Sequence, residues 1–211
     1  MVTMIPWKRI FITTAVALLL ASAAFASPAY AATGNQGYAV YRNGVIVAGV
    51  DQWHAALMSL PHWNSGSLPV IHARSGSNWV QYGTWPEFTD GKTYQGTYRP
   101  KVAPTSAARD DFLYVARRLV DERIPYNLAY QVYYDTGTAG TWVEPAEITS
   151  MRCDGVVEYA YEWCGYRVYG NSTYWDVTKA GWLSREHHSG TAVTPRIQAQ
   201  SYLTKITASL P

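Results

Sequence analysis

Short apolar, β-rich runs separated by polar, turn-rich pieces fill the first half of the chain and predict a β-rich region. Residues 37–49, GYAVYRNGVIVAG, hold two such runs joined by Asn43-Gly44, a pair favoured in type I′ turns because both central residues need positive φ. Further strands are predicted in HAALMSL, LPVIHAR, NWVQYGTW and KTYQGTYR, which begin at residues 54, 68, 78 and 92. We therefore expect an antiparallel sheet of about five N-terminal strands that opens on a hairpin.

Helical periodicity replaces these short runs after residue 105. Thr105 or Ser106 is suited to cap an amphipathic helix that ends before Pro125. Its apolar stripe is formed by Phe112, Val115, Ala116, Leu119 and Val120. A second helix is predicted in MRCDGVVEYAYEWCG, residues 151–165, capped by Thr149 or Ser150 and stopped at Gly165. Strands followed by helices indicate an α+β fold, and residues 194–207 fit either a strand or a helix.

The N-terminal segment reads as a secretory signal peptide. Lys8 and Arg9 precede an apolar run, residues 10–26, and a small-residue cleavage motif ends at Ala31. We expect residues 1–31 to be removed, residues 32–211 to form one secreted domain, and the processed chain to have no stable membrane insertion.

Charge and composition narrow the possible partners. Residues 1–31 hold two of the 17 basic residues and none of the 15 acidic ones, so the remaining chain carries 15 of each sign. A neutral chain without a basic run gives no electrostatic reason to bind nucleic acid. The nine Trp and 17 Tyr suit either a carbohydrate or peptide groove or the core of a β-rich domain. We expect a monomer.

The two cysteines lie at opposite ends of the second predicted helix. Eleven residues of helix separate the Cα atoms of Cys153 and Cys164 by about 16 Å, whereas a disulfide requires about 4.4 to 6.8 Å, so we expect both thiols to be free. The helix N-terminus favours a thiolate at Cys153, with a pKa below about 8.5. The alternative is that both are core residues, because Cys153, Val156, Val157, Ala160 and Cys164 share one face.

A thiol nucleophile needs a base, and the base needs a group that orients it. His54 opens one predicted strand and His72 lies inside the next, so antiparallel pairing would bring the two rings together. The other three histidines are expected to be solvated, in a turn and in a polar loop: His62, His187 and His188.

Four segments carry a family resemblance: WHAALM, VIHARS, RIPYN and MRCDGVVEYAY. They resemble the papain-like NlpC-type cell-wall cysteine peptidases, in which a Cys opens a helix and the His residues lie on strands. The order His54, His72, Tyr126, Cys153 is similar to the circularly permuted branch, which includes YiiX-like and lecithin retinol acyltransferase-like proteins. The resemblance extends from Gly37 to about Gly170 and implies a papain-like sheet packed against helices.

The resemblance also implies roles. Cys153 would be the nucleophile, His54 the general base and His72 the residue that orients His54. Tyr126, Asp154 and Trp53 would contact substrate, with Tyr126 near the oxyanion. The sequence departs from the family pattern because the acid follows the Cys and a Ser is missing.

We therefore expect a secreted Cys-His-His hydrolase without a cofactor or metal, which cleaves an amide through an acyl-enzyme, in cell-wall peptide as the resemblance implies. A lipid or ester acyl hydrolase or acyltransferase on the same fold stays open. A zinc site made by Cys153, His54 and His72 stays open too, as does a non-catalytic glycan- or peptide-binding module. The aromatic surface of such a module would be Trp53, Trp63, Trp79 and Trp85. If the third member is not His72, His187 or Asp51 is the candidate.

Overall fold

The structure is a computed structural model that describes residues 34–59, 68–76, 78–134, 143–169 and 193–210. The predicted signal peptide lies outside the described residues. So do the turn that holds His62 and Trp63 and the loop that holds His187 and His188.

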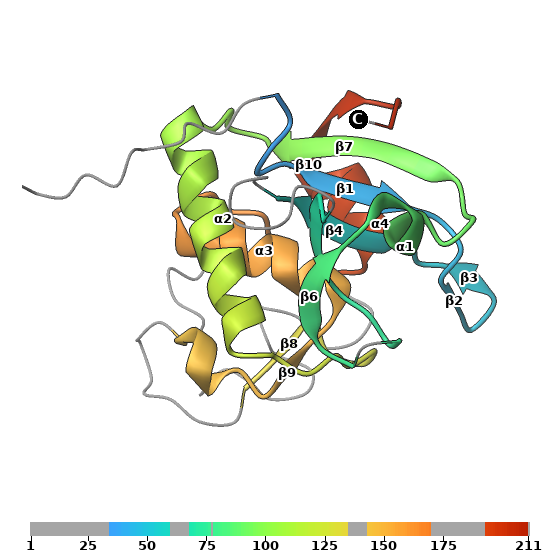
Figure 1. Ribbon diagram of the computed structural model, residues 1–211. Helices are drawn as coiled ribbons and strands as arrows, with labels where there is room; N and C mark the ends of the chain where they lie inside the picture. Colours follow the sequence, from blue (N-terminus) through green and yellow to red (C-terminus); the bar gives the residue numbers. More distant parts are fainter. Residues whose placement is uncertain (1–33, 60–67, 77, 135–142, 170–192, 211) are drawn as a thin grey trace, which may run out of the picture.

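A six-stranded antiparallel sheet forms the centre of the α+β fold (Figure 1). Its strands, in spatial order, are β10 (Leu203–Thr207), β7 (Tyr94–Pro100), β1 (Ala39–Arg42), β4 (His54–Met58), β5 (Val70–Ala73) and β6 (Val80–Gly83). Five of these strands, β1 and β4 to β7, lie in segments predicted as strands, as expected for about five N-terminal strands. The sixth, β10, was not expected in the sheet; it comes from the end of the chain and pairs with β7.

The predicted hairpin at Asn43-Gly44 is wrong. All four residues of β1 are buried, and β1 pairs with β4 and β7 instead of with the run that follows it. That run forms a separate small hairpin, β2 (Ile46–Val47) and β3 (Val50–Asp51), whose turn residues Ala48 and Gly49 have φ of 50° and 79°. Because β4 and β7 occupy both hydrogen-bonding edges of β1, the run that follows β1 has no edge left to pair with, and this tertiary pairing outweighs the local turn preference.

Two helices cover one face of the sheet. The predicted amphipathic helix is α2 (Ser106–Asp121), capped by Thr105, and the cysteine helix is α3 (Cys153–Trp163). They pack against each other, with the rings of Phe112 and Tyr161 4.7 Å apart (Figure 1). The predicted stripe of α2 is buried except for Val120, which is partly buried.

The opposite face is covered by a short helix that the sequence pattern did not predict, α1 (Trp85–Thr89). Phe88 of α1 packs on Val40, Ala56, Met58 and Val70. The remaining short elements are η2 (Pro145–Glu147), β8 (Val132–Tyr133), β9 (Ser150–Met151), α4 (Pro195–Ile197) and the π-helical turn η4 (Gln198–Tyr202). Residues 194–207, which fitted either type, thus contain both helical turns and a strand.

The start of α3 differs from the prediction. The residue before the helix is Arg152, and the predicted cap Ser150 pairs in β9 with Tyr133 of β8. This pairing places Cys153 as the first residue of α3. The predicted end is confirmed, because Gly165 follows the helix with φ of 82°. In the described segments, no helix combines the length and the apolar character needed to cross a membrane.

Candidate active site

A cavity of about 270 Å³ lies where α3 begins. It is bordered by five separate segments of the chain: the β2–β3 hairpin, the start of β4, the loop after Tyr126, the start of α3 and the start of α4. Its lining residues are Val45, Val47, Gln52, Trp53, His54, Tyr126, Leu128, Ala129, Arg152, Cys153, Thr194 and Pro195. The structure thus brings four of the six predicted site residues, Cys153, His54, Tyr126 and Trp53, to one cavity.

The sulfur of Cys153 is hydrogen-bonded to the backbone of the sheet. Its Sγ accepts hydrogen bonds from the backbone N–H groups of Ala55, next to His54, and of Asp154, in the first turn of α3. Only 4% of the residue is exposed. Cys153 and Cys164 are both free, as predicted.

The expected low pKa of Cys153 is not found. Burial, followed by the nearby Asp154 carboxylate, raises the pKa of the thiol to about 12, and this outweighs the lowering by the two N–H groups and by Arg152. The helix N-terminus is present, but desolvation of the thiolate is the larger effect. Cys153 is therefore a protonated thiol at neutral pH in the structure.

His54 and His72 lie side by side on neighbouring strands. Nε2 of His54 and Nδ1 of His72 are 3.0 Å apart, in hydrogen-bonding distance, and both residues are buried. Phe88 packs against both rings, at centroid distances of 5.6 and 6.2 Å. His72 does not line the cavity; it lies behind His54.

Both imidazoles are neutral. Burial, followed by His72, Arg42 and Arg74, holds the pKa of His54 well below 6.5, and burial and Arg74 lower the pKa of His72 to about 3. The resting site thus pairs a neutral thiol with a neutral imidazole.

The far side of His72 is closed by Gly83 of β6. A Cβ at Gly83 would lie 2.7 Å from Nε2 of His72, so only glycine leaves room for the ring. This Nε2 is buried and has no hydrogen-bond partner. The single polar contact of His72 is therefore directed to His54.

Tyr126 and Trp53 form parts of the cavity wall. Burial and then Cys153 raise the pKa of Tyr126 to about 12, which keeps its hydroxyl protonated and able to donate a hydrogen bond. Trp53 is 9% exposed and has φ of 67°, an uncommon conformation for a non-glycine residue. Such strain concentrates at functional sites.

Asp154, a predicted substrate contact, faces away from the cavity. It is fully buried and receives hydrogen bonds from Arg152, with Nε to Oδ1 at 2.6 Å and Nη2 to Oδ2 at 2.8 Å. Gln131 Nε2 also donates to Asp154, at 3.2 Å. Asp154 therefore anchors the start of α3, and no contact with substrate is available to its carboxylate.

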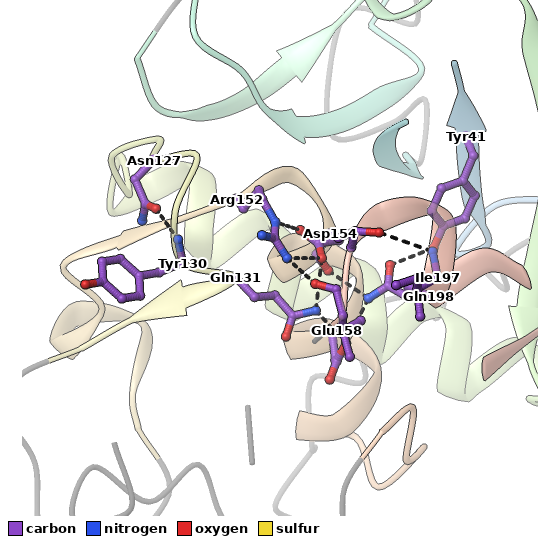
Figure 2. A network of polar contacts seen from close by, with 11 residues as sticks. Tyr41, Asn127, Tyr130, Gln131, Arg152, Asp154, Glu158, Ile197 and Gln198 are labelled. Atoms are coloured by element: carbon purple, nitrogen blue, oxygen red, sulfur yellow. Dashed lines mark hydrogen bonds and ion pairs between the residues drawn. The ribbon is translucent and has the colours of Figure 1, made fainter. Parts of the chain in front are cut away.

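A buried polar network continues from Asp154 beneath α3 (Figure 2). Gln131 Nε2 donates to Oε2 of Glu158 at 2.6 Å, and Gln198 Nε2 donates to the same oxygen at 2.9 Å. Gln198 Oε1 accepts from the hydroxyl of Tyr41 at 2.7 Å. Burial and then Glu162 raise the pKa of Glu158 well above 4.5, so Glu158 is held as the neutral acid. The network ties α3 to β1 and η4.

Arg152 and Gln52 line the cavity and were not singled out in the sequence. The clue to Arg152 was its position in Arg152-Cys153-Asp154, where a cation and an anion flank the thiol. Gln52 directly precedes Trp53 and His54, and the turn that leads into β4 brings it to the cavity.

Three of the four tryptophans proposed as the surface of a binding module are described, and they lie in different surroundings; Trp63 is outside the described residues. Trp53 is in the cavity wall, whereas Trp85 packs on Phe88 and Tyr94, and Trp79 is 43% exposed. Over the described ranges, no group of three His, Cys, Asp or Glu side chains could hold a metal ion, so the zinc hypothesis has no ligand cluster there.

Comparisons with protein-family models, curated proteins and solved structures find no match to this chain. The chemical interpretation of the cavity rests on its own residues.

Proposed function

We propose that this protein is a cysteine hydrolase that cleaves an amide bond through an acyl-enzyme. One observation carries the proposal: Cys153 and His54 line the same cavity, and His54 is hydrogen-bonded behind the cavity to His72. A nucleophile, a base and a group that orients the base are the three parts such chemistry needs.

Because the Cys153 thiol and the His54 imidazole are both neutral at rest, the proton that moves first is the thiol proton. As Sγ of Cys153 attacks the carbonyl carbon, Nδ1 of His54 takes the thiol proton, and the backbone N–H of Cys153, the first residue of α3, stabilises the oxyanion. His54 then gives this proton to the leaving nitrogen while the carbon–nitrogen bond breaks. Water, deprotonated by the same Nδ1, attacks the thioester and releases the acid and the thiol.

His72 selects the useful tautomer of His54. For Nδ1 to accept a proton, Nε2 of His54 must carry hydrogen and donate it to Nδ1 of His72. His72 then carries its own hydrogen on Nε2, against Gly83.

We further propose a permuted papain-like domain over residues 32–211, secreted as a monomer, with cell-wall peptide as substrate. Its support is the chain order His54, His72, Tyr126, Cys153, together with a cysteine helix packed on an antiparallel sheet.

The test is digestion of purified cell wall by wild type, Cys153→Ala and Cys164→Ala, followed by mass analysis of released fragments. Fragments from wild type and Cys164→Ala alone are expected. Identical profiles from wild type and Cys153→Ala would reject the peptidase.

A second candidate is a binding module in which Cys153 is an inert core thiol, which its burial and raised pKa favour. Iodoacetamide labelling separates the two, because Cys164 also has a pKa of about 12 but does not line the cavity. The hydrolase predicts that Cys153 reacts faster than Cys164 and slows in His54→Ala. The module predicts slow labelling of Cys153 that His54→Ala leaves unchanged.

A further inference from the structure

The walls of the cavity are mainly apolar. Their apolar side chains come from separate parts of the chain: Val45, Val47, Trp53, Leu128, Ala129 and Pro195. Because they lie on different elements, they enclose a volume instead of forming one stripe.

The charged side chain in this lining, that of Arg152, already has an ion-pair partner. Arg152 is 5% exposed, and its guanidinium is paired with Asp154 and also donates to the backbone oxygen of Val193. No other lysine, arginine, aspartate or glutamate lines the cavity within the described ranges. A substrate carboxylate would therefore lose its hydration there without gaining an unpaired cation as partner, which is costly.

Exposed apolar side chains continue the lining outward. Ile46 lies between two cavity residues of the β2–β3 hairpin and is 65% exposed, and Leu128, a lining residue from a different segment, is 49% exposed. Exposed apolar residues clustered beside a cavity mark binding sites more often than isolated ones do.

We infer that the acyl group transferred to Cys153 is uncharged and aliphatic, with roughly six carbons or more. The inference rests on the proposed function. The volume is sufficient, since a cavity of about 150 Å³ lined by such side chains binds benzene and this one measures about 270 Å³. In the acylation step the Sγ–carbon bond forms, the bond to the leaving group breaks, and the thiol proton passes through His54 to the leaving group.

Two sources supply such a group: a linear acyl chain, or a peptide whose residue at the scissile carbonyl has an aliphatic side chain. The test compares p-nitrophenyl esters of acetate, hexanoate, N-acetyl-leucine and adipate, the last bearing a free terminal carboxylate. The rate that depends on Cys153 is the release of nitrophenolate by wild type minus that by Cys153→Ala.

Burial of a methylene favours binding by up to about fourfold, so hexanoate or N-acetyl-leucine should exceed acetate at least about tenfold in kcat/KM. The better of these two esters identifies the source. Adipate should fall at least about tenfold below hexanoate. Equal rates for acetate, hexanoate and N-acetyl-leucine, or for adipate and hexanoate, would overturn the inference and leave the hydrolase standing. No Cys153-dependent release from any ester would overturn both.

Substitutions of lining residues test whether the apolar walls of the cavity cause this substrate preference. Val47→Asp and Leu128→Asp alter two different segments of the wall. Each should lower the ratio of kcat/KM for the preferred ester to kcat/KM for acetate at least about tenfold. Val102→Asp is the matched control, because Val102 is 73% exposed and does not line the cavity. Thermal melting checks that each variant is folded. An unchanged preference in both wall variants would contradict the assignment.

Discussion

Nε2 of His54 lies 3.0 Å from Nδ1 of His72, and this is the single hydrogen bond that His72 makes through its ring. The contact joins a residue of the cavity wall to one that is fully buried. Because Phe88 and Gly83 pack around the His72 ring, His72 has little freedom to turn away. In the proposed enzyme, His72 is a positioning residue that acts through His54.

Substitutions at the three residues should damage turnover in a fixed order: Cys153→Ala most, then His54→Ala, His72→Ala and His72→Gln. Loss of the nucleophile or base should cost at least about a thousandfold in kcat, and His72→Ala about ten- to a hundredfold. A glutamine amide can still hydrogen-bond to His54, so it should retain more activity than alanine. Steady-state kinetics with thermal melting of each variant tests this order. Wild-type turnover by His72→Ala would place the third member elsewhere.

Gly83→Ala should lower kcat because the new Cβ pushes against the His72 ring, at a stability cost of about 1–3 kcal/mol. A double-mutant cycle with His72→Gln tests the route: if Gly83 acts through His72, adding the alanine to His72→Gln should cost clearly less. Gly76→Ala is a control, since its Cβ would meet only the end of the Arg74 side chain. Equal losses in both backgrounds would show that Gly83 acts independently of His72.

The pH profile should lack the usual histidine limb. The pKa of His54 is held well below 6.5 by burial, so the neutral base persists below that pH, and kcat/KM should be unchanged between about pH 7.5 and 6. The pKa of Cys153 is raised to about 12, so no activation should follow a thiol ionisation near pH 8.5. A limb at pH 6.5 or above, or a rise through 8.5, would indicate an ion-paired site.

The strands of the sheet were largely readable from short β-favouring runs bounded by turn residues, because β1 and β4 to β7 lie in such runs. Which strands pair with β1 could not be predicted from the sequence. All residues of β1 are buried, and its two partner strands, β4 and β7, do not follow it directly in the chain. The meeting of His54 and His72 followed from neighbouring strands. The raised pKa of Cys153 could not be predicted in this way. Its position at the helix N-terminus favours the thiolate, but burial, which depends on the tertiary structure, has the larger and opposite effect.

Asp51 has a structural role that its sequence position did not reveal. Its Oδ1 accepts backbone N–H groups of Gly44, Val45 and Trp53, at 3.0, 3.3 and 3.2 Å, and so fixes the strained turn before His54. Asp51→Ala should destabilise the fold by about 1–3 kcal/mol and raise KM more than it lowers kcat, because the cavity wall loosens. Asp51→Asn should recover part of both effects, since its amide oxygen still accepts. Chemical denaturation and kinetics measure the two. A loss of kcat equal to that of His72→Ala would instead favour Asp51 as the third member.

In the proposed mechanism, Cys153 is acylated during turnover. The most direct test is rapid acid quenching of the purified protein with a p-nitrophenyl ester, followed by digestion and mass measurement of the peptides that contain Cys153 and Cys164. The two thiols have the same raised pKa of about 12, but only Cys153 shares a cavity with His54. The acyl mass is expected on Cys153, with little on Cys164, and it should form much more slowly in His54→Ala. No adduct on Cys153, or equal labelling of both cysteines at a rate that His54→Ala leaves unchanged, would contradict it.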